Sequence, residues 1–148
     1  MEEKAKNNLE GISEYEKLYF DYNSTFLSSD WNKRLMVCQE MASKFPDAPR
    51  SQTDLGFTFL NGNETDKARA CFQKAIEIDP KWVGGYTATL NAYLFFDPKD
   101  FKKAEENALK AVELAPSSPG IRIALGDCYR AENDLVKAKE ADTKAIEL

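Results

Sequence analysis

A segment that recurs at a nearly fixed interval is the feature that most constrains how this chain can fold. Pro46, Pro80 and Pro116 are spaced 34 and 36 residues apart. The run Lys-Ala-Ile-Glu-Ile-Asp-Pro that ends at Pro80 returns as Lys-Ala-Val-Glu-Leu-Ala-Pro at Pro116, and in shortened form at 144–148. Self-similarity with a period of about 20–50 residues indicates an array of stacked supersecondary units. We therefore expect a repeat architecture.

Two sets of alanines keep the same interval, with separations of 36 and 34 residues in each set. The sets are Ala68, Ala104 and Ala138, and Ala75, Ala111 and Ala145. Helix axes approach to about 8–10 Å when the side chains at the crossing are small. The alanines therefore predict pairs of antiparallel helices that pack through short side chains, and Gly56 is expected to serve the same purpose.

The stretch from Pro49 to Pro80 resembles the tetratricopeptide repeat, whose pattern is W-x2-L-G-x2-Y, then A-x3-F, then Pro. The residues that match are Leu55, Gly56, Phe59, Ala68, Phe72 and Pro80. The Trp position departs from the pattern, because Gln52 stands there. The resemblance implies an all-α fold, namely a right-handed α-α superhelix of about four antiparallel helix pairs.

The period divides the chain into a short lead and an array. We expect an N-terminal lead over 1–12 and a repeat array over 13–148. The expected repeats are 15–48, 49–82, 83–118 and 119–148. In the second repeat, helices are predicted over about 51–61 and 65–78, and Gly62 is expected to supply a positive φ in the turn between them.

Several helix starts carry capping signals. Ser13 and Glu16 have the spacing of a capping box, and Asp30 and Asp100 precede predicted helices as N-caps. Ser118 is also predicted to cap a helix whose first residue is a proline.

The last repeat departs from the others in two ways. Asp142 stands where the second repeat has Phe72, so the last helix pair is expected to pack less tightly. The sequence stops at Leu148, two residues before the next proline position, with no capping helix after it. We therefore expect either that the chain is a fragment of a longer array or that a partner or a second copy covers the last helix pair.

Charge and hydropathy argue against several classes of partner. The 25 acidic and 20 basic residues give a net charge of -5, which does not favour binding to nucleic acid or to an anionic membrane. No apolar run reaches the roughly 18–20 residues of a membrane span, and the N-terminus lacks the apolar segment of a secretory signal. A cytoplasmic location is the expectation.

The chain offers little for catalysis, cofactors or metals. It contains no histidine, the commonest general base and metal ligand. Cys38, Cys71 and Cys128 lack the CxxC spacing of a zinc site, and their odd number does not favour a disulfide framework. Gly84-Gly85 lacks the Gly-Lys-Ser/Thr ending of a phosphate-binding loop. We expect no enzymatic activity, no cofactor and no metal.

The resemblance implies that the first helix of each repeat lines a concave groove that binds a peptide segment of a protein partner. Counted by family position, the expected groove residues are Tyr19, Asn23, Asp54, Phe57, Asn91, Ile123, Asp127 and Arg130. Because this lining is aromatic, small and mildly acidic, the partner is expected to be apolar or mildly basic. Phe57 is the predicted apolar anchor, and the amide of Asn91 suits a peptide backbone.

One known role of the family is disfavoured. Members that grip the C-terminal carboxylate of chaperones carry cations in this groove, whereas here Asp54, Thr87 and Asn91 stand on the corresponding surface. Asp54 would repel a carboxylate. The alternative to peptide binding is a structural spacer or self-association unit, in which the uncapped C-terminal helix pair makes a homo-oligomer.

Overall fold

The computed structural model describes residues 13–28 and 30–148, and the predicted lead 1–12 lies outside them. Over the described residues the chain forms eight α-helices and no β-strand. The helices are α2 (Glu14–Ser28), α3 (Trp31–Lys44), α4 (Pro49–Asn61), α5 (Thr65–Ile78), α6 (Val83–Phe95), α7 (Phe101–Leu114), α8 (Pro119–Ala131) and α9 (Leu135–Ile146). The predicted all-α fold is confirmed.

Local capping fixes the starts of four of these helices. Before α2, the Ser13 N–H donates to Glu16 Oε2 at 2.7 Å, and the Glu16 N–H donates to Ser13 Oγ at 3.3 Å. The carboxylates of Asp30, Asp100 and Asp134 each accept from the backbone N–H three residues later, at 3.0, 3.1 and 3.1 Å. Each such cap stabilises its helix by about 1 kcal/mol.

Proline sets two other helix starts. Pro49 is the first residue of α4, two residues earlier than predicted, and Pro119 is the first residue of α8. Ser118 occupies the N-cap position of α8, as predicted, but its side chain makes no capping hydrogen bond. The fixed φ of proline suits the first helical position, and its missing N–H leaves one donor fewer to cap.

The turn between α4 and α5 differs from the prediction. Gly62 has φ -89°, and Asn63 has φ 59° instead. Asparagine tolerates the left-handed region better than most residues, and Asn133 does the same between α8 and α9, with φ 63°. Gly62 is needed for another reason: a Cβ built there would lie 2.7 Å from Cζ2 of Trp31. The Trp31 indole N–H donates to the Thr58 carbonyl at 3.0 Å and holds the ring in place.

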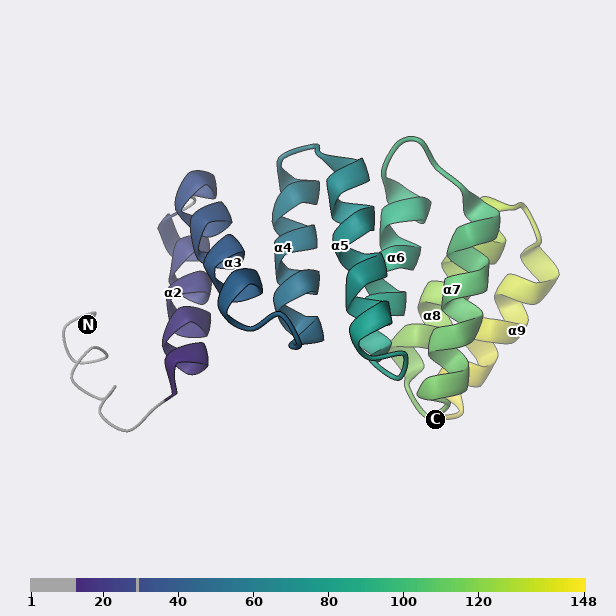
Figure 1. Ribbon diagram of the computed structural model, residues 1–148. Helices are drawn as coiled ribbons and strands as arrows, with labels where there is room; N and C mark the ends of the chain where they lie inside the picture. The colour runs from purple at the N-terminus through teal and green to yellow at the C-terminus, as the bar shows by residue number, and fades with distance from the viewer. Residues whose placement is uncertain (1–12, 29) are drawn as a thin grey trace.

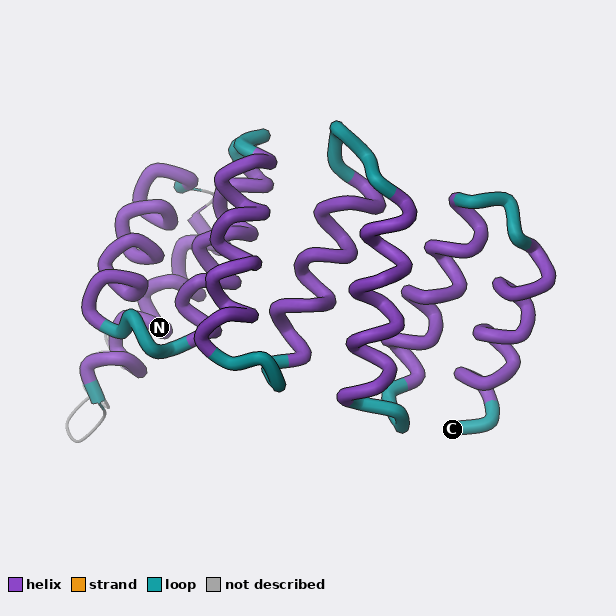
Figure 2. The backbone as a smooth tube through the Cα atoms, turned by 45° about the vertical axis from the view of Figure 1, so that its right-hand side comes forward, coloured by secondary structure: helices purple, strands orange, loops and turns teal. Residues whose placement is uncertain are grey.

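Successive helices run in alternating directions and stand side by side in a curved row from α2 to α9 (Figure 1). Short loops join the helices alternately along the upper and lower edges of the row (Figure 2). Each helix packs against the next, and α6 also contacts both α4 and α8. We call α2, α4, α6 and α8 the inner layer and α3, α5, α7 and α9 the outer layer. Within the outer layer, α5, α7 and α9 make no such contacts, so the row curves around the inner layer and forms an α-α superhelix.

Alanine and glycine make the close contacts between helices. All six alanines of the two repeated sets are buried, with at most 8% of their surface exposed. Phe72 on α5 is fully buried, and a Cβ built on Gly56 of α4 would overlap its ring. The helix pair α4–α5 therefore fits together because Gly56 leaves room for an aromatic side chain.

The buried residues form two clusters that meet at α6. Ala88 and Ala92 belong to the cluster that extends from α2 to α5, whereas Leu90 and Leu94 belong to the cluster that extends to α9. Because α6 contributes to both clusters, it couples the two halves of the array.

The last helix pair replaces aromatic packing with a charged contact. A Cβ built on Gly126 would lie 2.6 Å from Asp142 Oδ1, so Asp142 occupies the place that Phe72 fills beside Gly56. Arg130 Nη1 donates to Asp142 Oδ2 at 2.7 Å. An ion pair that is about 40% exposed on each side contributes little stability, so looser packing of this pair stays our prediction.

Candidate functional site

All eight residues predicted to bind a partner lie on inner-layer helices, but they differ in exposure. Asn23, Phe57, Ile123 and Arg130 are exposed. Tyr19, Asn91 and Asp127 are half-buried. Asp54 is buried. The structure therefore offers most of this set to a partner, and its polar members other than Asn91 belong to two separate clusters.

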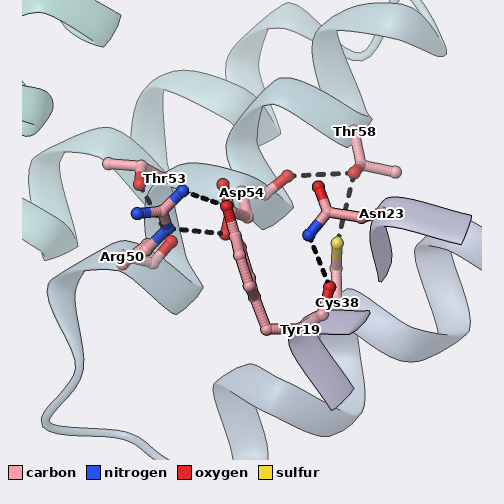
Figure 3. Close-up of polar contacts among 7 residues, drawn as sticks. All are labelled: Tyr19, Asn23, Cys38, Arg50, Thr53, Asp54 and Thr58. Atoms are coloured by element: carbon pink, nitrogen blue, oxygen red, sulfur yellow. Dashed lines mark hydrogen bonds and ion pairs between the residues drawn. The ribbon is translucent and has the colours of Figure 1, made fainter. Parts of the chain in front are cut away.

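The first cluster joins α2 to the start of α4 (Figure 3). Arg50 donates from Nη2 to the hydroxyl of Tyr19, and its guanidinium carbon lies 4.4 Å above the centre of the Tyr19 ring. Arg50 Nε lies 3.7 Å from Asp54 Oδ2. Beside them, the Asn23 side-chain amide donates to the Tyr19 carbonyl at 2.7 Å. One amide donor of Asn23 is therefore already used within α2.

Asp54 is the most unusual member of this cluster. Only 9% of the residue is exposed, and its Oδ2 accepts no hydrogen bond from the described residues. Burial raises the pKa of this carboxyl from its usual value to about 6, and the nearby Arg50 guanidinium opposes the shift. A carboxylate with so little water around it is costly to ionise and gains from any additional cation or donor.

Hydrogen bonds fix α4 beneath this cluster. Thr58 Oγ1 donates to the Asp54 carbonyl at 2.9 Å and lies 3.3 Å from Cys38 Sγ on α3. Thr53 Oγ1 donates to the Arg50 carbonyl at 2.9 Å. Thr53 and Thr58 therefore bond to the backbone of α4, and Thr58 also contacts α3, which fixes the stretch of backbone that carries Arg50 and Asp54 (Figure 3).

The second cluster joins the end of α8 to α9. Arg130 donates from Nη2 to Asp127 Oδ1 at 2.5 Å and from Nη1 to Asp142 at 2.7 Å. These two carboxylates raise the pKa of the guanidinium, Asp127 more than Asp142. Both predicted acidic residues of the inner layer thus have an arginine of the same helix as a partner.

Two apolar side chains lie on the same inner layer. Phe57 is 38% exposed, and its ring centre lies 5.1 Å from that of the buried Phe72. Ile123 on α8 is 48% exposed. Phe57 therefore packs against the core residue Phe72 and is also partly exposed to solvent, whereas Ile123 belongs to neither core cluster.

The sequence reasoning missed Arg50 and Asp142. Arg50 stands four residues before Asp54, a spacing that places two side chains on the same helix face, and this signal could have identified the pair. No comparable signal marks Asp142, because it meets Arg130 from a different helix.

A depression of about 430 Å³ opens between α5, α6 and α7, away from both clusters. Arg69 lines it, but this guanidinium already donates to the carbonyls of Ala92, Phe96 and Pro98 at 2.9, 3.1 and 2.7 Å. These hydrogen bonds connect α5 to the end of α6 and to the α6–α7 loop, so the guanidinium is already occupied.

Neither a metal cluster nor a membrane-spanning helix is found in the part of the chain that the structure describes. Over residues 13–28 and 30–148, no group of three or more Cys, Asp or Glu side chains is arranged to hold a metal ion. No described helix combines the length and the apolar character that crossing a bilayer requires.

Sequence comparisons identify similar proteins. Residues 49–81 match the family model of the tetratricopeptide repeat. The chain is 29% identical over 96 residues to interferon-induced protein with tetratricopeptide repeats 3 of Mus musculus, covering 64% of this chain and 24% of that protein. It is also 29% identical over 104 residues to interferon-induced protein with tetratricopeptide repeats 2 of Cricetulus griseus, covering 64% of this chain and 21% of that protein. The chain thus spans less than a quarter of the length of these relatives.

Solved structures share the fold. TTC0263, a thermophilic tetratricopeptide-repeat protein of Thermus thermophilus, superposes with a TM-score of 0.77 at 17% identity, covering 90% of this chain and 74% of that chain. MamA (41-end) of Desulfovibrio magneticus RS-1 gives a TM-score of 0.76 at 21% identity, covering 91% and 75%. Together with the internal period and the paired helices, these matches identify residues 49–81 as a tetratricopeptide repeat, within an array that has the fold of tetratricopeptide-repeat proteins.

Proposed function

We propose that this protein is a non-enzymatic interaction module that binds an extended peptide segment of a protein partner along the inner layer. The family and the fold are those of protein–protein interaction scaffolds. The observation that carries the proposal is the exposure of Phe57 and Ile123 on inner-layer helices. Asp54 stands three residues before Phe57 and Asp127 four residues after Ile123, so each acid lies on the same helix face as the apolar side chain. Exposed apolar side chains next to polar groups are the usual anchors of a binding surface.

The chemistry of the surface indicates the kind of partner. Phe57 and Ile123 favour apolar side chains, and Asn91 offers both a donor and an acceptor to a peptide backbone. Asp54 and Asp127 disfavour a carboxylate in the peptide. The overall charge of -5 favours a partner that is neutral or basic.

A peptide-display selection tests this proposal directly. Peptides selected on the wild-type chain are synthesised, and their affinity is measured for Ile123→Ala, Phe57→Ala and the matched control Leu109→Ala. Leu109 is 46% exposed but lies on outer-layer helix α7. We expect losses of about tenfold for the two inner-layer variants, equivalent to about 1.4 kcal/mol each, and no change for Leu109→Ala.

Since Phe57 also packs on Phe72, each variant is melted in parallel, and Ile123→Ala decides the result if Phe57→Ala loses stability. Failure to select any peptide, or equal affinity for all three variants, would reject peptide binding on the inner layer.

Self-association is a second candidate, favoured by exposed apolar residues on α9. Leu135, Val136 and Ile146 are 65%, 71% and 86% exposed. If these residues join two copies, sedimentation at increasing concentration will show a dimer, and Val136→Lys will abolish it because a buried unpaired charge opposes association. A strictly monomeric wild-type chain at tens of micromolar, roughly the range where weak dimers form, counts against this candidate.

A further inference from the structure

The inner layer is wider between α2 and α4 than elsewhere. No Cα atom of α2 lies within 8 Å of one in α4, whereas α4 and α6, and also α6 and α8, approach within that distance. Long side chains bridge the wider interval, above all Tyr19 from α2 and Arg50 from α4. The interval is therefore closed by side chains that can move and not by backbone packing.

Asp54 lies at the base of this interval. It is nine-tenths buried, and its Oδ2 has no hydrogen-bond partner among the described residues. The titratable groups coupled to its charge are Tyr15 and Tyr22 of α2, Cys38 of α3 and Arg50 of its own helix. Tyr19 of α2 shares the Arg50 guanidinium with it, and Arg34 of α3 bonds instead to Thr25. An acidic group in such surroundings favours a cation with a donor aimed at the free oxygen.

Arg50 lies next to the Asp54 carboxylate but does not donate a hydrogen bond to its Oδ2. Its Nε stays 3.7 Å from Asp54 Oδ2, beyond hydrogen-bond distance, while its guanidinium lies over the Tyr19 ring. The Arg50 side chain is 48% exposed, so little packing holds it there. An ion pair four residues apart on one helix contributes only about 0.3–0.5 kcal/mol, which a competing cation can replace.

We propose that Tyr19, Arg50 and Asp54 form a subsite for an arginine of the bound peptide, whose guanidinium displaces Arg50, stacks on Tyr19 and hydrogen-bonds to Asp54. We call this set the cation subsite. The proposal rests on the proposed function and adds the side chain that the peptide must carry. Arg50 itself shows that a guanidinium fits over the tyrosine ring, and planar guanidinium groups stack on aromatic faces where a lysine ammonium does not.

The high pKa of Asp54, about 6, agrees with a carboxylate that lacks a full partner in the free protein. A cation that binds to it favours the ionised form and lowers that pKa. Binding of arginine is therefore expected to weaken as the pH falls through about 6.

Small-molecule probes test the subsite independently of any peptide. N-acetyl-arginine N-methylamide is titrated into ¹⁵N-labelled protein at about pH 8, where Asp54 is ionised, and the amide shifts of α2 and α4 are followed. N-acetyl-citrulline N-methylamide, which has nearly the same shape without the charge, is the control ligand. We expect saturable shifts near Tyr19 and Asp54 with the arginine probe and none with citrulline.

Two substitutions and one matched control complete the experiment. Asp54→Asn is expected to weaken binding of the arginine probe by at least about tenfold without lowering the melting temperature, because it removes a buried charge. Arg50→Gln is expected to tighten binding several-fold, since it removes the internal competitor. Asp66→Asn, which removes an exposed acid from outer-layer helix α5, is expected to change nothing.

Equal shifts from citrulline, undiminished binding by Asp54→Asn, or weaker binding by Arg50→Gln would each overturn the cation subsite. These results are separable from those on the proposed function. Selected peptides that depend on Ile123 but ignore Asp54 would leave the peptide surface in place and reject only the subsite.

Discussion

Asp54 carries its negative charge where few water molecules reach it, and the fold bears a cost for this charge. Because burial raises its pKa to about 6, the folded chain holds the Asp54 proton more tightly than the unfolded chain does. Stability therefore falls as the pH rises from about 4 through about 6, where the folded carboxyl ionises. At about 1.4 kcal/mol per pKa unit, the shift of roughly two units corresponds to at most about 3 kcal/mol.

Asp54→Asn tests this cost. The variant is expected to match the wild type in free energy of unfolding below about pH 4 and to exceed it by up to about 3 kcal/mol above about pH 7. Urea denaturation across this range measures the difference between the two proteins. Capping carboxyls such as Asp100 and Asp134 change stability in the opposite direction, because the backbone N–H groups that donate to them lower their pKa values. Both proteins contain these carboxyls, so their effect cancels in the difference. A gap that stays constant with pH would show that Asp54 does not titrate as described.

Phe72 is the largest fully buried side chain of the core. Phe72→Ala is expected to lower the free energy of unfolding by roughly 3–5 kcal/mol, because truncating a buried aromatic loses its transfer energy and leaves a cavity. Chemical denaturation measures the loss, with Val136→Ala as an exposed control that should change stability by less than about 0.5 kcal/mol. A loss below about 1 kcal/mol for Phe72→Ala would mean that this face of α5 is not central to the core.

At the scale of a helix, the contact between Phe72 of α5 and Gly56 of α4 can also be tested by changing Gly56. Alanine favours a helix over glycine by about 1 kcal/mol, but a Cβ at Gly56 would overlap the Phe72 ring. We expect Gly56→Ala to destabilise the fold by about 1–3 kcal/mol, as overpacked cores do. Gly120→Ala is the matched control on α8, since no atom lies within 4 Å of a Cβ built there, and it should be neutral or slightly stabilising.

A double-mutant cycle identifies the cause. If the clash with Phe72 explains the loss, Gly56→Ala will cost much less in the Phe72→Ala background, and the two effects will not add. Additive losses would point to a defect elsewhere in α4.

Helices were the part of the fold that the sequence predicted well, because their signals are local. The alanine intervals, the acidic N-caps and the prolines each act within one repeat, so Asp30 and Asp100 cap as expected. The errors arise where a second helix intervenes. Gly62 was assigned a positive φ because glycine commonly adopts one, whereas it actually makes room for Trp31 of α3.

At the scale of the whole array, each helix pair depends on its neighbours. Helix α5 packs between α4 and α6, whereas α9 packs only on α8 among the described helices. The α8–α9 pair also has Asp142 and Arg130 where α4–α5 has a buried aromatic ring. We expect amide hydrogens of α9 to exchange with solvent faster than those of α5, because opening α9 breaks fewer contacts. Hydrogen-exchange mass spectrometry measures both helices in one experiment, and equal protection would indicate that the array opens as a single unit.

The predicted partner surface illustrates why a site is harder to read than a fold. The family positions all lie on inner-layer helices, yet they could not distinguish the exposed Ile123 from the buried Asp54. Asp54 lies beside the bridge that Tyr19 and Arg50 make between two helices, and that bridge spans 31 residues of sequence. Such contacts follow from the stacking of the repeats and not from any one of them.

The three thiols differ in a way that matters for spectroscopy. Cys38 and Cys128 are fully buried, and burial raises their pKa values to about 11 and about 12, whereas Cys71 on α5 is half-buried with a raised pKa as well. Because alkylation needs access as well as a thiolate, a maleimide dye will attach first to Cys71 in the native protein. The unmodified sequence therefore already provides one labelling position near the middle of the array, from which fluorescence can follow a ligand or a second copy.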